Sequence, residues 1–88
     1  MLYMVIESFR SANPDQVGAR FRAKGRLMPE GAGLEYVASW MAADGTRCYQ
    51  LMNAPSREAF DGWIANWSDL VDFEVIEVQT SADFWANR

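Results

Sequence analysis

The sequence predicts one small α+β domain with the ferredoxin-like order βαββαβ, in which a four-stranded antiparallel sheet carries two helices on one face. Three observations support this fold class. Four segments with the apolar composition of strands are interleaved with two segments of helical periodicity. An Asp44-Gly45 pair between two strand-like segments indicates a hairpin. The length of 88 residues is that of a single domain, which we expect to span 1–88 with 80–88 as a C-terminal tail.

The first half of the chain reads as a strand followed by a helix. Residues 2–9 begin with five consecutive apolar side chains, as expected for a strand covered on both faces. Asn13 suits the position that caps a helix and Pro14 its first turn, so a helix is expected to run from there to about Arg26. Four basic residues near the end of this helix are expected to form a solvated face: Arg20, Arg22, Lys24 and Arg26.

The second half reads as strand, strand, helix, strand. Residues 29–33 form a loop by composition, 34–43 and 46–53 are the two strands of the hairpin, 56–70 hold a helix capped by Ser56, and 71–79 form the last strand. Large apolar side chains of this helix recur at helical spacing and are expected in the core: Phe60, Trp63, Ile64 and Trp67.

A two-residue type I′ turn at Asp44-Gly45 would set the register of the hairpin, pairing Ser39 with Gln50 and Val37 with Met52. One face of the hairpin then carries Val37, Ser39, Met41, Cys48, Gln50 and Met52. The other face carries Tyr36, Ala38, Trp40, Ala42, Arg47, Tyr49 and Leu51. Neither face is polar throughout, so the sheet face opposite the helices should be covered, most simply by a second copy of the chain. The aromatic face is the favoured dimer interface because interfaces are enriched in such residues: Tyr36, Trp40, Arg47 and Tyr49.

The composition excludes several classes of function. A net charge of −4 is unfavourable for binding nucleic acid or an anionic membrane surface, and no apolar run is long enough to span a bilayer. The absence of histidine and the single Cys48 exclude a structural zinc site, and no other cofactor is expected. With no disulfide and no basic leader at the N-terminus, a cytoplasmic location is expected.

A few polar residues stand out within apolar segments. Ser39, Cys48 and Gln50 form a small cluster that would orient a ligand in an apolar pocket, or else would belong to an ordinary core. Glu7 lies on an apolar strand, where a raised pKa would suit acid–base chemistry, although pairing with an arginine at a strand end is the alternative. No catalytic signature is present, so Glu7 is the one candidate for a catalytic residue. A carboxylate triplet, Asp69, Asp72 and Glu74, fits a solvated edge better than a metal site.

Several segments together resemble a known family. These are residues 4–7, 20–22, 25–31, 34–40, 47–52, 67–74 and 80–82. They are similar to a bacterial family, domain of unknown function 3303, over residues 2 to about 82. The resemblance implies a bacterial protein with a ferredoxin-like fold of the dimeric α/β-barrel type, and it implies no activity or catalytic residue. Ala32-Gly33 departs from the family pattern as a short insertion in a loop.

These observations lead to three hypotheses about function. The first is a cytoplasmic homodimer that binds a small, largely apolar ligand. The second, by analogy of fold, is a cofactor-free enzyme of the antibiotic-monooxygenase or muconolactone-isomerase type. The third is a structural or partner-binding module. A closed apolar cavity with polar groups inside the protomer would favour the first, and a carboxylate reaching into that cavity would favour the second.

Overall fold

The computed structural model, which describes residues 1–88, contains four strands and three α-helices. They are β1 (Leu2–Phe9), α1 (Asp15–Lys24), β2 (Glu35–Met41), β3 (Arg47–Asn53), α2 (Asp61–Ala65), β4 (Val71–Glu77) and α3 (Ser81–Ala86). Short 3-10 helices at Arg10–Ala12 and Arg57–Phe60 precede α1 and α2. The strands pair antiparallel in the order β2-β3-β1-β4. This confirms the predicted α+β fold with the ferredoxin-like order of elements.

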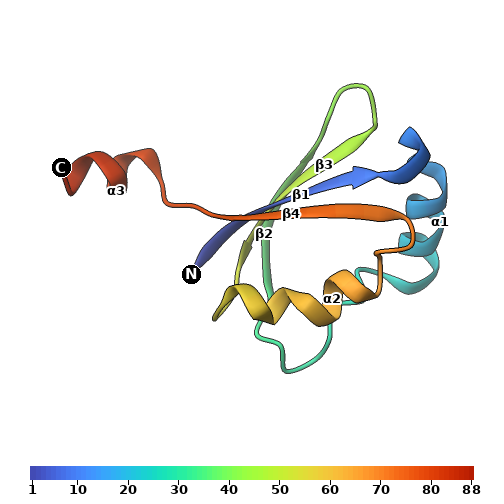
Figure 1. The fold of residues 1–88 in the computed structure, drawn as a ribbon, viewed down its shortest axis with the longest axis horizontal. Coiled ribbons are helices and arrows are strands. Elements are labelled where there is room, and N and C mark those ends of the chain that lie inside the picture. Colours follow the sequence, from blue (N-terminus) through green and yellow to red (C-terminus); the bar gives the residue numbers. More distant parts are fainter.

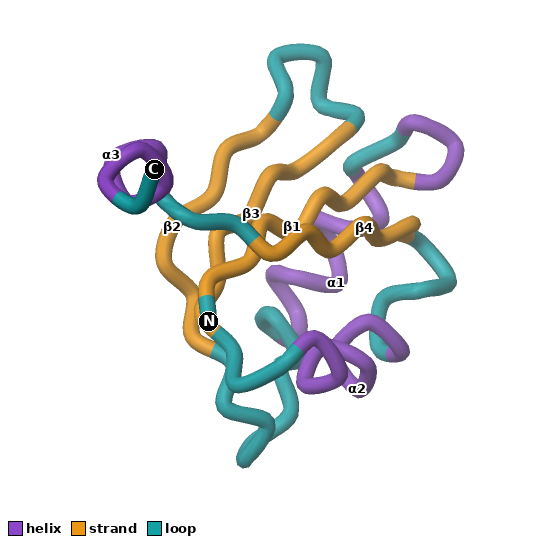
Figure 2. The backbone as a smooth tube through the Cα atoms, turned by 60° about the vertical axis from the view of Figure 1, so that its left-hand side comes forward, coloured by secondary structure: helices purple, strands orange, loops and turns teal.

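The molecule has two layers, with α1 and α2 on the same face of the sheet (Figures 1 and 2). The alternation of the central strand β1 explains the layering, because Tyr3, Val5 and Phe9 are buried beneath the helices. Across the sheet, Val5 pairs with Gln50 of β3 and with Val75 of β4, so these residues share the helix-covered face. No helix of the chain has the length and apolar character needed to cross a membrane.

The hairpin of β2 and β3 has the predicted register near its turn but not at its far end. Ser39 pairs with Gln50, as predicted. A β-bulge then falls between Tyr36 and Ala38, so that Tyr36, not Val37, opposes Met52. Because the extra residue shifts the alternation by one, the predicted placement of Tyr36 beside Trp40 was wrong, and Tyr36 belongs to the helix-covered face.

The turn itself differs in type from the prediction. The Gly45 amide donates to the Ala42 carbonyl at 2.8 Å, so Ala43 and Asp44 occupy the centre of the turn. Gly45 follows with a φ of 76°, whereas Asp44 has no positive φ, so the type I′ turn at Asp44-Gly45 was wrong. The Asp44 carboxylate stabilises the loop by accepting hydrogen bonds from the Thr46 amide at 3.0 Å and from its hydroxyl at 2.7 Å.

The second helix is shorter than predicted but buries the expected residues. Its first turn is a 3-10 helix, Ser56 makes no capping hydrogen bond, and α2 proper ends at Ala65. Phe60, Trp63 and Trp67 are nevertheless among the core residues, as predicted. Their rings pack in edge-to-face contacts: Phe60 lies 5.1 Å from Tyr3, and Trp63 lies 5.5 Å from Phe73, between ring centroids. This packing holds α2 over β1 and β4.

The first helix is held differently, and no residue of α1 is buried. The Asn13 side chain accepts a hydrogen bond from the Asp15 amide at 2.9 Å, which is the capping role predicted for it. Gly25 ends the helix with a φ of 71°, a conformation that glycine adopts without strain. The helix is therefore well delimited in sequence, yet it does not rest closely on the sheet.

The C-terminal residues form an element that was not predicted. Residues expected to be a short tail contain α3, which begins where the Thr80 hydroxyl accepts a hydrogen bond from the Asp83 amide at 3.0 Å. The helix projects away from the two layers (Figure 1). Phe84 and Trp85 pack on each other at 5.1 Å, and Trp85 remains 68% exposed.

Candidate functional site

A cavity of about 460 Å³, open to solvent on one side and not closed as hypothesised, lies between α1 and the sheet. It exists because α1 stands away from β2 and β3, while the core residues of α2 fill the space over β1 and β4. Its walls are largely apolar and aromatic: Phe9, Val17, Phe21, Met41, Trp63 and Trp67. A volume of this size falls within the range of about 300–1,000 Å³ that is typical of small-molecule sites.

The floor of the cavity brings together the polar residues singled out in the sequence. Glu7 of β1 pairs with Cys48 of β3, and Ser39 of β2 pairs with Gln50 of β3, in two adjacent rows of the sheet. All four residues line the cavity. The Ser39 hydroxyl lies 2.8 Å from the Tyr36 hydroxyl, and Gln50 is buried with its amide nitrogen 3.2 Å from the Met52 sulfur. The predicted cluster is thus the polar part of one apolar cavity.

The carboxyl group of Glu7 has an unusual environment. Burial raises its pKa from 4.5 to about 7, against a smaller opposing effect of the positive charge of Arg26. None of the ion pairs of the chain includes Glu7. The alternative hypothesis of a strand-end carboxylate in an ion pair therefore does not hold. A carboxyl group with a pKa near neutrality can both donate and accept a proton at physiological pH.

The thiol of Cys48 is a poor nucleophile in this setting. Burial, and secondarily the negative charge of Glu7, raise its pKa to about 11. The reactive form of a cysteine is the thiolate, so Cys48 contributes a neutral, polarisable group to the floor.

The loop after α1 places Arg26 at the cavity, and two tryptophans hold that loop in position. The indole N–H groups of Trp63 and Trp67 both donate to the Arg26 carbonyl, at 2.9 and 2.8 Å. The Asn66 side chain donates to the next carbonyl, that of Leu27, at 2.9 Å. Leu27 has a φ of 58°, which is strained for a leucine, and these hydrogen bonds offset that strain.

The guanidinium group of Arg26 is held between two aromatic rings. Its central carbon lies 3.9 Å from the centroid of the Tyr36 ring and 5.3 Å from that of Phe21. Arg22 also lines the cavity, and neither arginine takes part in an ion pair. The predicted solvated basic face is therefore wrong for Arg26, which is half-buried at the cavity, whereas Arg22 lines the cavity and remains exposed.

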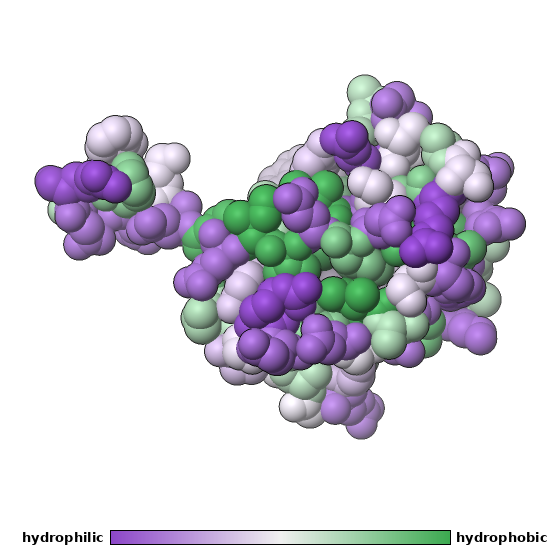
Figure 3. All heavy atoms as spheres, in the orientation of Figure 1, coloured by the Kyte–Doolittle hydropathy of each residue, from purple (hydrophilic) through white to green (hydrophobic).

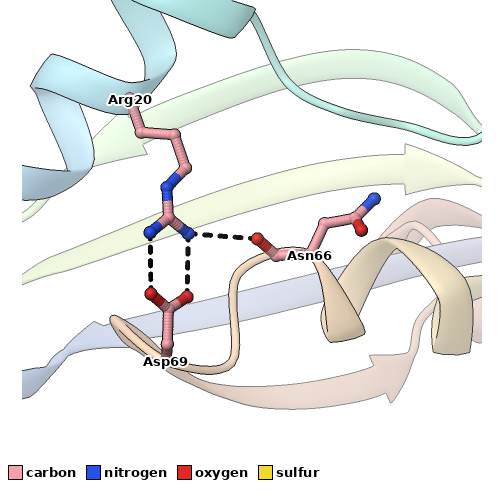
Figure 4. Close-up of polar contacts among 3 residues, drawn as sticks. All are labelled: Arg20, Asn66 and Asp69. Atoms are coloured by element: carbon pink, nitrogen blue, oxygen red, sulfur yellow. Dashed lines mark hydrogen bonds and ion pairs between the residues drawn. The ribbon is translucent and has the colours of Figure 1, made fainter.

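A polar clamp fastens α1 across the molecule. Arg20 donates two hydrogen bonds to the Asp69 carboxylate, at 2.8 and 2.7 Å, and a third to the Asn66 carbonyl at 3.1 Å (Figure 4). Its guanidinium carbon also lies 5.4 Å from the Trp67 ring centroid. The hydrogen bond with Arg20 lowers the pKa of Asp69 to about 2, so the pair is charged at neutral pH. The clamp ties α1 to the turn that follows α2, beside the cavity.

The carboxylate triplet considered in the sequence is dispersed by these contacts. Asp69 binds Arg20, and Asp72 binds Arg10 at 3.0 Å. No group of three metal-ligating side chains is assembled anywhere in the chain.

The model of the family described as domain of unknown function (DUF3303) matches residues 1–87. The chain belongs to this family. No curated protein and no solved structure shows significant similarity to it.

The opposite face of this DUF3303 domain is open and rich in apolar side chains. Trp40, Tyr49 and Ile6 form one row that ends at Glu74, and the next row contains Arg47, Ser8 and Asp72. Trp40 is 55% exposed and Ile76 is 42% exposed. Hydrophobic residues gather where β1 and β4 run towards the C-terminal helix (Figure 3). Of the predicted interface residues, Trp40, Arg47 and Tyr49 thus share the open face, and Tyr36 does not.

Two arginines of the cavity could not be foreseen from the sequence. Arg22 and Arg26 were assigned to a solvated helix face, although both line the cavity. The alternation of basic and apolar residues in that helix carried no sign of a cavity. The signal that could have found Arg26 is Trp63 and Trp67, since two buried indoles each need an acceptor for their N–H groups.

Proposed function

We propose that this chain is a bacterial, cytoplasmic, homodimeric domain that binds a small, largely apolar ligand in the cavity between α1 and the sheet. The observation that carries the proposal is the cavity itself. Apolar walls that enclose a few convergent polar groups are the usual composition of a small-molecule site. A protein this small has little core to spare, and the space is not filled by its own side chains.

The test is native mass spectrometry of the purified protein, with two matched leucine variants. Gly18 lines the cavity, and a Cβ at this position would meet only the flexible end of Arg22, at 3.4 Å. Gly18→Leu should therefore fill part of the cavity and displace a co-purified molecule. Ala19→Leu, on the exposed side of the same helix turn, should retain it. Equal retention by both variants would place the ligand elsewhere. A protein that is empty and binds nothing from a library of small apolar compounds would favour the structural or partner-binding alternative.

A second candidate function is proton transfer without a cofactor, of the kind that the antibiotic-monooxygenase or muconolactone-isomerase analogy suggests. The observation that favours it is Glu7, whose pKa of about 7 suits a general acid or base and which lines the cavity. The test is to incubate the co-purified molecule with the protein in D2O and to measure deuterium incorporation. Exchange that Glu7→Gln abolishes, while binding persists, supports catalysis. Binding without any exchange contradicts it.

The proposed dimer rests on the open sheet face and on the C-terminal helix. On this face Arg47 lies on β3 and Glu74 on the edge strand β4, two strands away. Neither residue is in an ion pair within the chain. Under two-fold symmetry a face meets itself, so these opposite charges can approach one another across the interface. Trp85 of α3, which is 68% exposed, supplies a further apolar surface. A stable interface of this kind buries roughly 1,200–2,000 Å².

Light scattering at micromolar concentration tests the dimer. The expected mass is twice the 10.0 kDa of the chain. Trp40→Glu should give a folded monomer, because it places a charge at an exposed apolar position of the open face. Ala19→Glu, on the outer side of α1, should leave the dimer intact. A wild-type monomer would refute this part of the proposal without affecting the cavity.

A further inference from the structure

The charge balance around the cavity is unusual for this chain. Acidic residues outnumber basic ones, and the net charge is −4. Three of the five arginines elsewhere, Arg10, Arg20 and Arg57, are each neutralised by an aspartate, whereas Arg47 and Arg88 have no ion pair. Arg22 and Arg26, which line the cavity, have no such partner. In a chain with carboxylates in excess, two unpaired arginines at one apolar cavity indicate that the missing anion comes from the ligand.

Of the two arginines that line the cavity, Arg26 is held more rigidly. Its backbone is anchored by Trp63 and Trp67, and its guanidinium plane is stacked on the Tyr36 ring. Stacking on a ring leaves the N–H groups at the edge of the guanidinium free to donate. A fixed, planar set of donors matches the two oxygens of a carboxylate and binds them in a bidentate manner.

The remaining walls determine what the rest of the ligand can be. The indole N–H groups of Trp63 and Trp67 are both occupied by the Arg26 carbonyl, so these side chains can offer the ligand only ring surface. Phe9 and Phe21 add two more rings. Aromatic walls favour a flat, aromatic body over a flexible chain, because rings pack on one another in stacked and edge-to-face arrangements.

We propose that the ligand of this cavity is a small aromatic carboxylate, with its carboxylate bound by Arg26 and its ring held among Phe21, Trp63 and Trp67. This rests on the proposed function, since it names the chemical class bound at the same site. Glu7 on the floor lies near the anionic group and, in its neutral form, donates a hydrogen bond to the ligand.

The electrostatics of the floor make binding depend on pH. The charged or titratable groups at the cavity besides Glu7 are Arg26 from the loop, Arg22 and Asp15 from α1, and the thiol of Cys48 from β3. The Cys48 thiol stays neutral, since its pKa is about 11. The cavity walls from α2 carry no charge, and neither does Phe73 of β4, which pairs with Glu7 in the sheet. An ionised Glu7 repels a carboxylate, so affinity should fall as the pH rises through about 7.

Isothermal titration calorimetry with three probes tests the inference: 2-naphthoate, the neutral 2-naphthamide, and octanoate. We expect 2-naphthoate to bind about tenfold or more tightly than the amide, because only the carboxylate forms charge-assisted hydrogen bonds with Arg26. We expect octanoate, which has the same head group on an aliphatic chain, to bind more weakly than 2-naphthoate. Affinity for 2-naphthoate should decrease by about tenfold between pH 6 and pH 8 in the wild type and stay constant in Glu7→Gln.

Two charge-removing variants identify the binding group. Arg26→Met keeps an unbranched apolar side chain over the Tyr36 ring and should abolish the preference for the acid over the amide. Lys24→Met removes one positive charge from α1 without touching the cavity and should preserve that preference. Retention of the preference in Arg26→Met overturns the assignment of Arg26.

The outcomes separate this inference from the proposed function. Equal binding of acid and amide overturns the carboxylate and leaves an apolar ligand site intact. Tighter binding of octanoate overturns the aromatic body. Failure of all three probes to bind, in a protein that also contains no co-purified molecule, overturns both.

Discussion

Replacing Glu7 by glutamine should stabilise the protein at alkaline pH, because the wild-type carboxyl group is held in an environment that disfavours its charge. Its pKa is 4.5 when unperturbed and about 7 in the folded protein. A group with a raised pKa binds its proton more tightly in the folded state. The stability that it contributes is therefore fully present below pH 4.5 and is lost as the pH rises through about 7.

The size of the effect follows from the two pKa values. Their difference, at about 1.4 kcal/mol for each unit, corresponds to about 3 kcal/mol. Glu7→Gln keeps the shape of the side chain and removes its charge. The free energy of unfolding of the variant, relative to that of the wild type, should be higher by about 3 kcal/mol at pH 8 than it is near pH 4. This is a large part of the stability of a small domain.

Urea denaturation of both proteins at intervals between pH 4 and pH 8 measures this difference. The comparison cancels the titration of all other groups, because they are common to the two proteins. Glu30→Gln, the same change at an exposed position of the loop after α1, is the control and should alter the stability by less than about 0.5 kcal/mol at every pH. A constant difference between wild type and Glu7→Gln from pH 4 to pH 8 would refute the reasoning that Glu7 is buried in the cavity floor.

The remaining predictions concern the core, α1 and metals. Trp63→Ala removes a buried ring and should cost about 3–5 kcal/mol, leaving a protein whose near-ultraviolet circular dichroism is largely lost at 37 °C; a wild-type unfolding curve would mean that α2 does not pack on the sheet. Gly18→Ala should raise the free energy of unfolding by about 1 kcal/mol, since glycine destabilises the interior of a helix and a methyl group has room here. A loss of stability would show that the Arg22 side chain cannot move aside for the methyl group. The pair of Arg20 and Asp69 should stabilise the fold above pH 4 and lose this effect as the pH falls towards 2, because the pKa of Asp69 is lowered. A double-mutant cycle measured across this range tests the prediction, and a coupling energy that does not change with pH would contradict it. Chelators should leave the melting temperature unchanged, and a stoichiometric metal found by elemental analysis would contradict this.

Much of the fold follows from local features of the sequence. The apolar run of β1, the Asn13-Pro14 helix start and the spacing of Phe60, Trp63 and Trp67 each act within a few residues of the chain, so the elements that they specify could be predicted. The register around Ser39 and Gln50 was correct even though the turn type was wrong, because a four-residue loop with Ala43 and Asp44 at its centre leaves the same pairs opposite one another. The order of elements then restricted the topology to a ferredoxin-like sheet.

The candidate site was predicted only in part. Ser39, Cys48, Gln50 and Glu7 could be found because a polar residue in an apolar strand stands out in the sequence, and strand pairing carries such residues to one face. Arg22 and Arg26 could not be found, since a basic residue on a helix is ordinarily solvated. The bulge between Tyr36 and Ala38 was equally invisible, and it moved Tyr36 from the expected interface to the stack on Arg26.

By itself, the sequence determined the layers of this protein: which segments are strands, which helical side chains are buried and which polar residues share the floor of the sheet. Only the tertiary structure decided that α1 stands away from the sheet and that a cavity lies beneath it. The physical reason is that periodicity specifies which face of a helix points inward but not how far away the opposing layer lies. That distance depends on long-range contacts, the clamp of Arg20 on Asp69 and the indole hydrogen bonds to the Arg26 carbonyl, whose partners are 37 to 49 residues apart in the chain.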